Sequence, residues 1–241
     1  MSRIITCGKT NDVSVLFFGR SNCDSSEKIL SHLIKCGFYV TYVKSKSRGE
    51  RLPEDIFWWK GDFILSFRSL FFLPKEILDR AKIAAINFHP APPEYPGSGC
   101  INFALYDRCK KYGVTAHLMN EKIDNGAILE VRRFPVHESE NLQSLLERTH
   151  GELLYLAFDF ITSLDKHGES FINEKINDSK GVNWKGKAKL MKEIDALQSI
   201  DLNVTKVELD RIVRATHIDG YPLKIKLHGY DFSLEKNINL L

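Results

Sequence analysis

Asn87 and His89 lie two positions apart at the end of an apolar run, residues 83–87. If that run is a strand, the spacing places both side chains on one of its faces. A neutral imidazole is a competent general base near pH 7, and an asparagine amide can donate a hydrogen bond to a developing oxyanion. A carboxylate beside them would orient the imidazole, and Asp124, in an Asp-Asn-Gly turn, is the nearest candidate by topology. These residue types predict acid–base catalysis with stabilisation of an oxyanion.

Each of these residues also has a purely structural interpretation. A histidine at a strand end can be a hydrogen-bonded structural residue, and an Asp-Asn-Gly sequence can be only a turn. The sequence lacks the motifs of three other kinds of site. No Ser or Cys sits in a nucleophile elbow, no histidine pair has metal-ligand spacing, and no dinucleotide-binding glycine motif is present. Cys100 follows a Gly-Ser-Gly loop, which disfavours a thiol nucleophile. We therefore expect neither a metal nor NAD(P).

Composition restricts the partners of the chain. Its 241 residues contain 34 Lys and Arg against 31 Asp and Glu, and a net charge of +3 is too small to imply a nucleic acid. No apolar run approaches the ~20 residues of a membrane span, and the polar start MSRIITCGKTND does not resemble a signal peptide. The five cysteines are odd in number and read as free thiols. We expect a cytoplasmic protein without membrane or nucleic-acid partners.

Short β-rich runs alternate with helical patterns in the first part of the chain. A strand over 13–18, a helix capped by Asp24 or Ser25 and ended by Gly37, and a strand over 38–43 form a βαβ unit. This unit predicts an α/β fold, a mostly parallel sheet with helices on both faces. The remaining pattern predicts strands over 62–66, 83–87, 114–119 and 127–134. It also predicts helices over 74–81, 102–111 and 141–164, although Gly151 is an unfavourable residue inside the last of these.

The composition of the chain becomes more polar after Leu164. Residues 166–189 are polar and contain three glycines, which is typical of an extended linker. A short helix over 206–215 and a hairpin over 224–234, turning at His228-Gly229, follow. We expect a catalytic domain over 1–165 and, over 166–241, a linker with a small C-terminal region. Its apolar hairpin is expected either to cover the core or to form a homodimer surface.

Three ordered blocks of sequence resemble the folate-dependent formyltransferases: residues 87–97 (NFHPAPPEYPG), 113–117 (GVTAH) and 123–129 (IDNGAIL). Weaker similarity extends over 66–74 and 210–215. The resemblance implies a Rossmann-like sheet, 10-formyltetrahydrofolate as the formyl donor and an amine as the acceptor. It also implies that Asn87, His89 and Asp124 are the catalytic trio.

The same resemblance implies where the substrates bind. Leu70, Phe71 and Phe72 match the stretch whose backbone binds the pterin ring, and Asp124 is expected to contribute to that site. Tyr95 and Tyr221 are candidates for stacking on a nucleotide base, with packing as their alternative role.

Branches of the formyltransferase family use different acceptor amines, and features of the sequence distinguish between these branches. Residues 18–22 (FGRSN) match the phosphate loop of the glycinamide ribonucleotide branch incompletely, and the region after residue 166 is short for the initiator-tRNA branch. Residues 91–94 and 102–106 resemble the short sugar N-formyltransferases. This branch implies a nucleotide-linked amino sugar, dTDP-4-amino-4,6-dideoxyglucose in our interpretation, destined for surface polysaccharide such as the O-antigen of lipopolysaccharide. Formylation of glycinamide ribonucleotide or tRNA, and a non-catalytic folate or nucleotide sensor, remain the alternatives.

Overall fold

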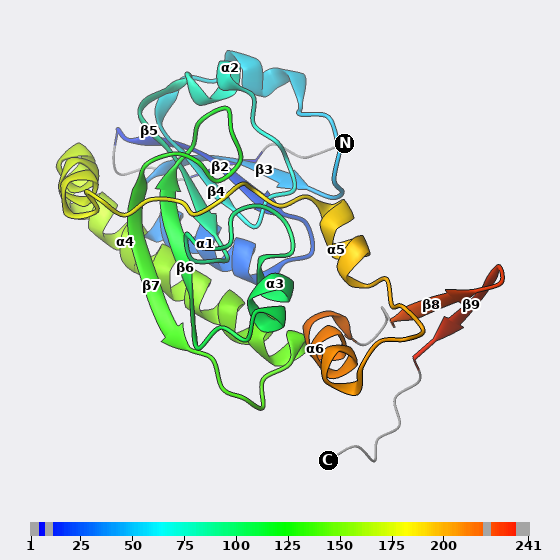
Figure 1. Ribbon diagram of the computed structural model, residues 1–241. Helices are drawn as coiled ribbons and strands as arrows, with labels where there is room; N and C mark the ends of the chain where they lie inside the picture. Colours follow the sequence, from blue (N-terminus) through cyan, green and yellow to red (C-terminus); the bar gives the residue numbers. More distant parts are fainter. Residues whose placement is uncertain (1–4, 8–11, 219–222, 235–241) are drawn as a thin grey trace.

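A seven-stranded sheet in the order β1-β3-β2-β4-β5-β6-β7 forms the centre of the computed structural model, which describes residues 5–7, 12–218 and 223–234 (Figure 1). Its strands are β1 (Ile5–Cys7), β2 (Ser14–Arg20), β3 (Tyr39–Ser45), β4 (Gly61–Phe67), β5 (Ala81–His89), β6 (Lys111–Leu118) and β7 (Ile128–Pro135). The four strands β3, β2, β4 and β5 pair in parallel, whereas β1, β6 and β7 join by antiparallel pairing. The expected α/β fold is confirmed, and β1 is a strand that we did not expect.

Helices cover both faces of the sheet, as the βαβ pattern predicts. Along β2, Val15 and Phe17 belong to one buried cluster, while Leu16 and Phe18 belong to another, because successive strand residues point to opposite faces. The first cluster is covered by α1 (Asp24–Lys35), α3 (Cys100–Tyr106) and the long α4 (Leu142–Asp178). The second is covered by the 3-10 helix η1 (Glu54–Trp58) and by α2 (Lys75–Leu78).

Three local expectations are wrong. Cys23, rather than Asp24 or Ser25, occupies the N-cap position of α1, and no side chain caps that helix. Helix α2 ends at Leu78 because Ala81 already pairs with Gly61 as the first residue of β5. Helix α3 ends at Tyr106 because Lys111 begins β6 and pairs with Pro135.

The expected linker over 166–189 is wrong for its first part. Helix α4 continues to Asp178, although Gly168 interrupts it with a non-helical backbone (φ 53°, ψ −133°). The chain resumes the helix because its next apolar residues are buried, and the Phe171 ring lies 4.9 Å from that of Phe160. The division into 1–165 and 166–241 stays a prediction, and α4 crosses it.

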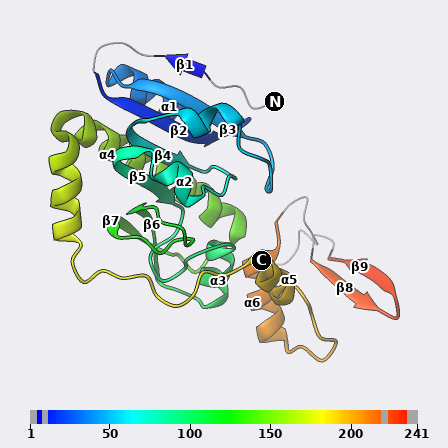
Figure 2. The same cartoon turned by 90° about the horizontal axis from the view of Figure 1, so that it is seen from above.

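The C-terminal region begins with an extended strap, residues 179–190, which runs past β7 and β6 in both views (Figures 1 and 2). The helices α5 (Met191–Leu197) and α6 (Lys206–Thr216) and the hairpin of β8 (Lys224–Leu227) and β9 (Tyr230–Ser233) follow. The expected helix and hairpin are confirmed, and Figure 2 shows the hairpin projecting beyond α6. Tyr230 and Phe232 are exposed, and their role in a homodimer stays a prediction.

No helix in the described part of the chain combines the length and the apolar character required to cross a membrane.

Candidate active site

The end of β5 holds Asn87 and His89, and the register with β6 places His117 directly opposite Asn87. Nδ1 of His117 lies 2.8 Å from the carbonyl oxygen of Leu118, and it must donate there because a carbonyl only accepts. In the neutral ring Nε2 is then an acceptor, and it lies 3.1 Å from Nδ2 of Asn87. The cross-strand pair therefore orients the Asn87 amide and leaves its second N–H available as a donor.

Asp124 lies in the turn between β6 and β7, in the left-handed backbone region (φ 43°). Its Oδ2 lies 3.3 Å from Nδ1 of His89 and accepts a hydrogen bond of 2.7 Å from the Gly97 amide. Its Oδ1 lies 3.4 Å from Nε2 of His117, an ion pair when that ring is protonated. The structure thus brings the three predicted residues together and adds His117, which the resemblance included without a role. Its position across from Asn87 depends on strand register, which the sequence alone does not specify.

The charge state of the site follows from its burial. His89 is 5% exposed, and burial lowers its pKa below the ordinary value, with His117 acting in the same direction and Asp124 opposing it. Burial would raise the pKa of Asp124, but His89, His117 and the Gly97 amide outweigh it and lower that pKa to about 2. At neutral pH the site therefore contains a neutral imidazole next to an ionised carboxylate.

The two ring nitrogens of His89 are not equivalent. Nε2 lies 3.2 Å from the carbonyl oxygen of Tyr95, so it carries the proton of the neutral ring. Nδ1 faces Asp124 and is the position that can accept a second proton. A proton taken up there is stabilised by the carboxylate, which is the arrangement that a general base requires.

A cavity of about 140 Å³ lies against this group and is lined by Asn87, His117 and Asp124, together with Phe71 and Phe72 of the predicted pterin loop. Leu70 does not line it; the Leu70 amide donates instead to Oγ of Ser45, at 2.9 Å, and so fixes the start of that loop. A second cavity, of about 330 Å³, adjoins the first, because Leu78, Met119, Asn120 and Lys122 line both.

Of the two tyrosines predicted to stack on a nucleotide base, Tyr95 and Tyr221, the structure describes only Tyr95. The ring of Tyr95 is half-buried and lies 6.0 Å from that of Tyr112, so it packs toward the interior, and the carbonyl oxygen of Tyr95 contacts His89. Tyr221 lies outside the described residues. Contact of either tyrosine with a nucleotide stays a prediction.

Trp184, in the strap, is a site residue to which we assigned no role from the sequence. Its ring packs edge-on against both imidazoles, with centroids 5.6 Å from His89 and 4.9 Å from His117, and its Nε1 donates to the carbonyl of Gly126 at 2.8 Å. The strap is held in place by two backbone hydrogen bonds: the Lys185 amide donates to the carbonyl of Pro93, and the Lys189 amide donates to the carbonyl of Pro96. Trp184 therefore shields the histidines from water.

We expect Trp184→Leu to raise the pKa of His89, because water then reaches the ring and relieves the burial that lowers it. If neutral His89 is the base, the acidic limb of the pH profile of kcat moves to higher pH, by roughly half a unit to one unit. Trp58→Leu is the matched control, because Trp58 is 83% exposed. Coincident profiles for wild type and Trp184→Leu would contradict the shielding role.

Gly126 permits the Asp124 turn to lie against β6. A Cβ at this position would overlap the carbonyl oxygen of Leu118, a backbone atom that cannot move aside alone. We expect Gly126→Ala to displace the turn, lower Tm by several degrees and reduce activity, measured by thermal unfolding and turnover. Gly151→Ala, in an uncrowded position of α4, should instead stabilise the protein by about 0.5–1 kcal/mol. Equal Tm values for the two variants would refute this account.

The segment of the chain that contains this site is similar to known proteins. Residues 38–153, which include the trio, match the family described as Formyl transferase. The chain is 26% identical over 203 residues to methionyl-tRNA formyltransferase of Lachnospira eligens, covering 80% of this chain and 61% of that protein. It is 26% identical over 163 residues to GDP-perosamine N-formyltransferase of Brucella melitensis, covering 67% and 59%. The chain thus spans about three fifths of the length of these relatives.

Solved structures share the fold. A sugar N-formyltransferase from Shewanella sp FDAARGOS_354 superposes with a TM-score of 0.72 at 19% identity, covering 96% of this chain and all of that one. An N-formyltransferase from Helicobacter canadensis, in complex with folinic acid and dTDP-3-aminofucose, superposes with a TM-score of 0.62 at 17% identity, covering 90% and 85%. The segment that contains the assembled trio, residues 38–153, thus matches the formyl transferase family, and the chain shares its fold with these N-formyltransferase structures.

Proposed function

We propose that this protein transfers a formyl group from 10-formyltetrahydrofolate to the amine of a nucleotide-linked amino sugar. The observation that carries this proposal is the group of Asn87, His89 and Asp124: Asn87 and Asp124 line a cavity together with residues 71–73, and the buried His89 lies 3.3 Å from Asp124. A sensor that only binds folate has no need of an acid–base group, so the arrangement favours an enzyme.

The residues around the cavity fit a folate. Phe71 and Phe72 offer apolar surface for a flat ring, while Asn87 and Asp124 offer hydrogen-bonding groups. The adjoining cavity, lined by Lys75 and Lys122 among others, provides room for the rest of such a molecule. When bound, the folate supplies the formyl group, and its complex with the Helicobacter canadensis fold relative, as folinic acid, supports this assignment.

The side chains then have distinct tasks. Negative charge develops on the formyl oxygen as the amine attacks, and the free N–H of Asn87 is placed to stabilise it, a contribution of about 3 kcal/mol for one such donor. His89 accepts the amine proton at Nδ1. Asp124, ionised because its pKa is about 2, then stabilises the imidazolium that forms.

An amino sugar is the acceptor that the comparisons support best. The Shewanella structure is a sugar N-formyltransferase, the Helicobacter canadensis structure holds dTDP-3-aminofucose, and a Brucella melitensis relative is named for GDP-perosamine. We propose dTDP-4-amino-4,6-dideoxyglucose as the substrate, in cytoplasmic synthesis of surface polysaccharide. Methionyl-tRNA is the competing acceptor, favoured by the similarity to the Lachnospira eligens enzyme.

The test is to mix the purified protein with 10-formyltetrahydrofolate and one acceptor at a time, and to measure tetrahydrofolate and formylated product by chromatography. We expect turnover with dTDP-linked 4-amino sugars and none with glycinamide ribonucleotide or methionyl-tRNA. Turnover with tRNA alone would establish the competing function. A folate-induced rise in Tm without turnover of any acceptor would refute an enzyme and support a sensor.

A further inference from the structure

The imidazole of His117 takes no part in the proton transfer proposed above, yet it lies inside the site. It is 2% exposed and contributes to the wall of the 140 Å³ cavity. Its Nε2 has two neighbours, Nδ2 of Asn87 at 3.1 Å and Oδ1 of Asp124 at 3.4 Å. A lone pair on Nε2 accepts a hydrogen bond from the amide, whereas a proton on Nε2 is repelled by it. The position of the His117 proton therefore decides how Asn87 is held.

The backbone places that proton on Nδ1. Nδ1 of His117 lies 2.8 Å from the carbonyl oxygen of Leu118, an ordinary hydrogen-bond distance. A lone pair on Nδ1 would face the lone pairs of the carbonyl at this distance, which is unfavourable. The Trp184 ring packs edge-on against the imidazole, with centroids 4.9 Å apart and planes at 85°, and so restricts rotation of the ring.

The distances at Nε2 fit a neutral ring better than a charged one. A protonated nitrogen bonded to a carboxylate is expected at about 2.7–2.9 Å, and the contact with Asp124 is longer than this. The contact with Asn87, at 3.1 Å, is within the ordinary range for an N–H donor. Asp124 is also bonded by the Gly97 amide at 2.7 Å and faces Nδ1 of His89. His117 therefore has its proton on Nδ1 and a lone pair on Nε2.

The two imidazoles of the site thus hold opposite tautomers. His89 has its proton on Nε2, toward the carbonyl of Tyr95, and keeps Nδ1 for the proton of the reaction. Each oxygen of Asp124 faces one of the rings, whose centroids lie 6.4 Å apart. Charge on His117 would oppose proton uptake by its neighbour, because His117 acts to lower the pKa of His89. The arrangement favours a division of tasks, with one ring as the base and the other kept neutral.

The orientation of the Asn87 amide depends on His117. The two ends of a primary amide differ in chemistry but hardly in size, so a half turn exchanges donor and acceptor at little steric cost. Among the described residues, His117 is the one hydrogen-bond partner of the Asn87 side chain. The lone pair on Nε2 selects the NH₂ end, whose second N–H stays available to the cavity that Asn87 lines. A proton on Nε2 would select the oxygen end and withdraw this donor.

We propose that His117 is a positioning residue, which stays neutral during the reaction and holds the Asn87 amide with its free N–H toward the formyl oxygen. The formyl oxygen rests on the proposed function; the tautomer of His117 and the orientation of Asn87 do not. The amine proton must then pass to His89, because a proton on His117 would turn the amide and remove the oxyanion donor.

The first test reads the tautomers from long-range proton–nitrogen NMR spectra of the protein with isotope-labelled histidines, without substrates. The signals are assigned by their loss in His117→Gln and in His89→Ala. We expect His117 to be protonated at Nδ1 and unprotonated at Nε2, and His89 to show the reverse. A proton on Nε2 of His117, in the other tautomer or in the imidazolium, would overturn the proposal.

The second test compares two variants of similar volume, His117→Leu and His117→Gln. Leucine has no acceptor, and we expect it to lower kcat about 10-fold, the value of one hydrogen bond, with little change in the KM of the folate. The glutamine oxygen reaches about as far as Nε2 and should recover most of this loss. Equal kcat in the two variants would refute the positioning role. His32→Leu is the control, because it removes a hydrogen bond to Thr162 between α1 and α4 and should change Tm without changing kcat.

A double-mutant cycle with Asn87→Ala separates positioning from support of the fold. Once the amide is absent, His117→Leu should cost nothing further in kcat. A further 10-fold loss in that background would refute action through Asn87. If the tautomers are as expected but no acceptor is formylated, the proposed function fails and the orientation of Asn87 stands. If sugars are formylated with equal kcat by wild type and His117→Leu, the positioning role fails alone.

Discussion

His89→Ala is expected to lower kcat by at least about 10³-fold, because it removes both the proton acceptor and the positive charge that forms on it. The fold should survive, since Asp124 keeps its hydrogen bond from the Gly97 amide and its contact with His117. Steady-state turnover with 10-formyltetrahydrofolate and the preferred amino sugar measures the first effect, and thermal unfolding measures the second.

His167→Ala is the control, because His167 is an exposed histidine of α4. It should retain wild-type kcat and Tm. Full activity in His89→Ala would exclude His89 as the base and move that role to His117, the other imidazole in contact with Asp124.

Asp124→Asn is expected to reduce kcat by about 10²- to 10⁴-fold with little change of shape. An amide cannot stabilise the imidazolium of His89 as a carboxylate does, and its NH₂ group can displace the ring from the present orientation. Asp62→Asn is a useful comparison, because Asp62 also accepts hydrogen bonds, from Ser14, but lies outside both cavities at the site. A similar loss of kcat in both variants would contradict a special role for Asp124.

Asp124 also makes stability depend on pH. Its pKa is lowered from 3.8 to about 2 on folding, so the ionised group stabilises the native state above pH 4, and this stabilisation is lost as the pH falls toward 2. The difference corresponds to roughly 2 kcal/mol. Denaturant unfolding of wild type and Asp124→Asn between pH 5 and pH 2 should show the wild-type advantage shrinking in this window. A difference that stays constant with pH would rule out this titration.

Much of the fold follows from local sequence patterns. The strand β2 is recognisable as a short continuous apolar run, and the helix α1 is recognisable because apolar residues recur at helical spacing and Gly37 follows its end. The patterns are less informative where packing decides the outcome. Residues 166–178 read as a polar linker, yet burial of Phe171 and Ile172 makes them helical. The short β1 lacks a distinctive pattern, and its pairing with β3 defines it.

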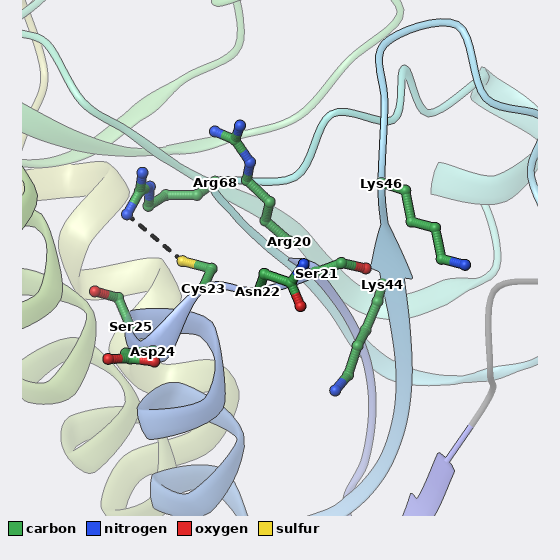
Figure 3. Close-up of a pocket in the computed structure, with 9 residues that line it drawn as sticks. All are labelled: Arg20, Ser21, Asn22, Cys23, Asp24, Ser25, Lys44, Lys46 and Arg68. Atoms are coloured by element: carbon green, nitrogen blue, oxygen red, sulfur yellow. Dashed lines mark hydrogen bonds between the residues drawn. The ribbon is translucent and has the colours of Figure 1, made fainter. Parts of the chain in front are cut away.

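The sequence alone predicts the group at the site: Asn87 and His89 are expected to share a strand face because they are two residues apart, and the resemblance of the three matching blocks implies Asp124 as their partner. The residues that surround this group become visible in the folded chain. His117 joins the group through the register of β5 with β6, and Trp184 contacts it from the strap. Arg20 and Arg68 line one cavity where the parallel strands β2 and β4 end (Figure 3). These contacts join residues distant in the chain, and no local spacing encodes them because they depend on strand order, register and packing.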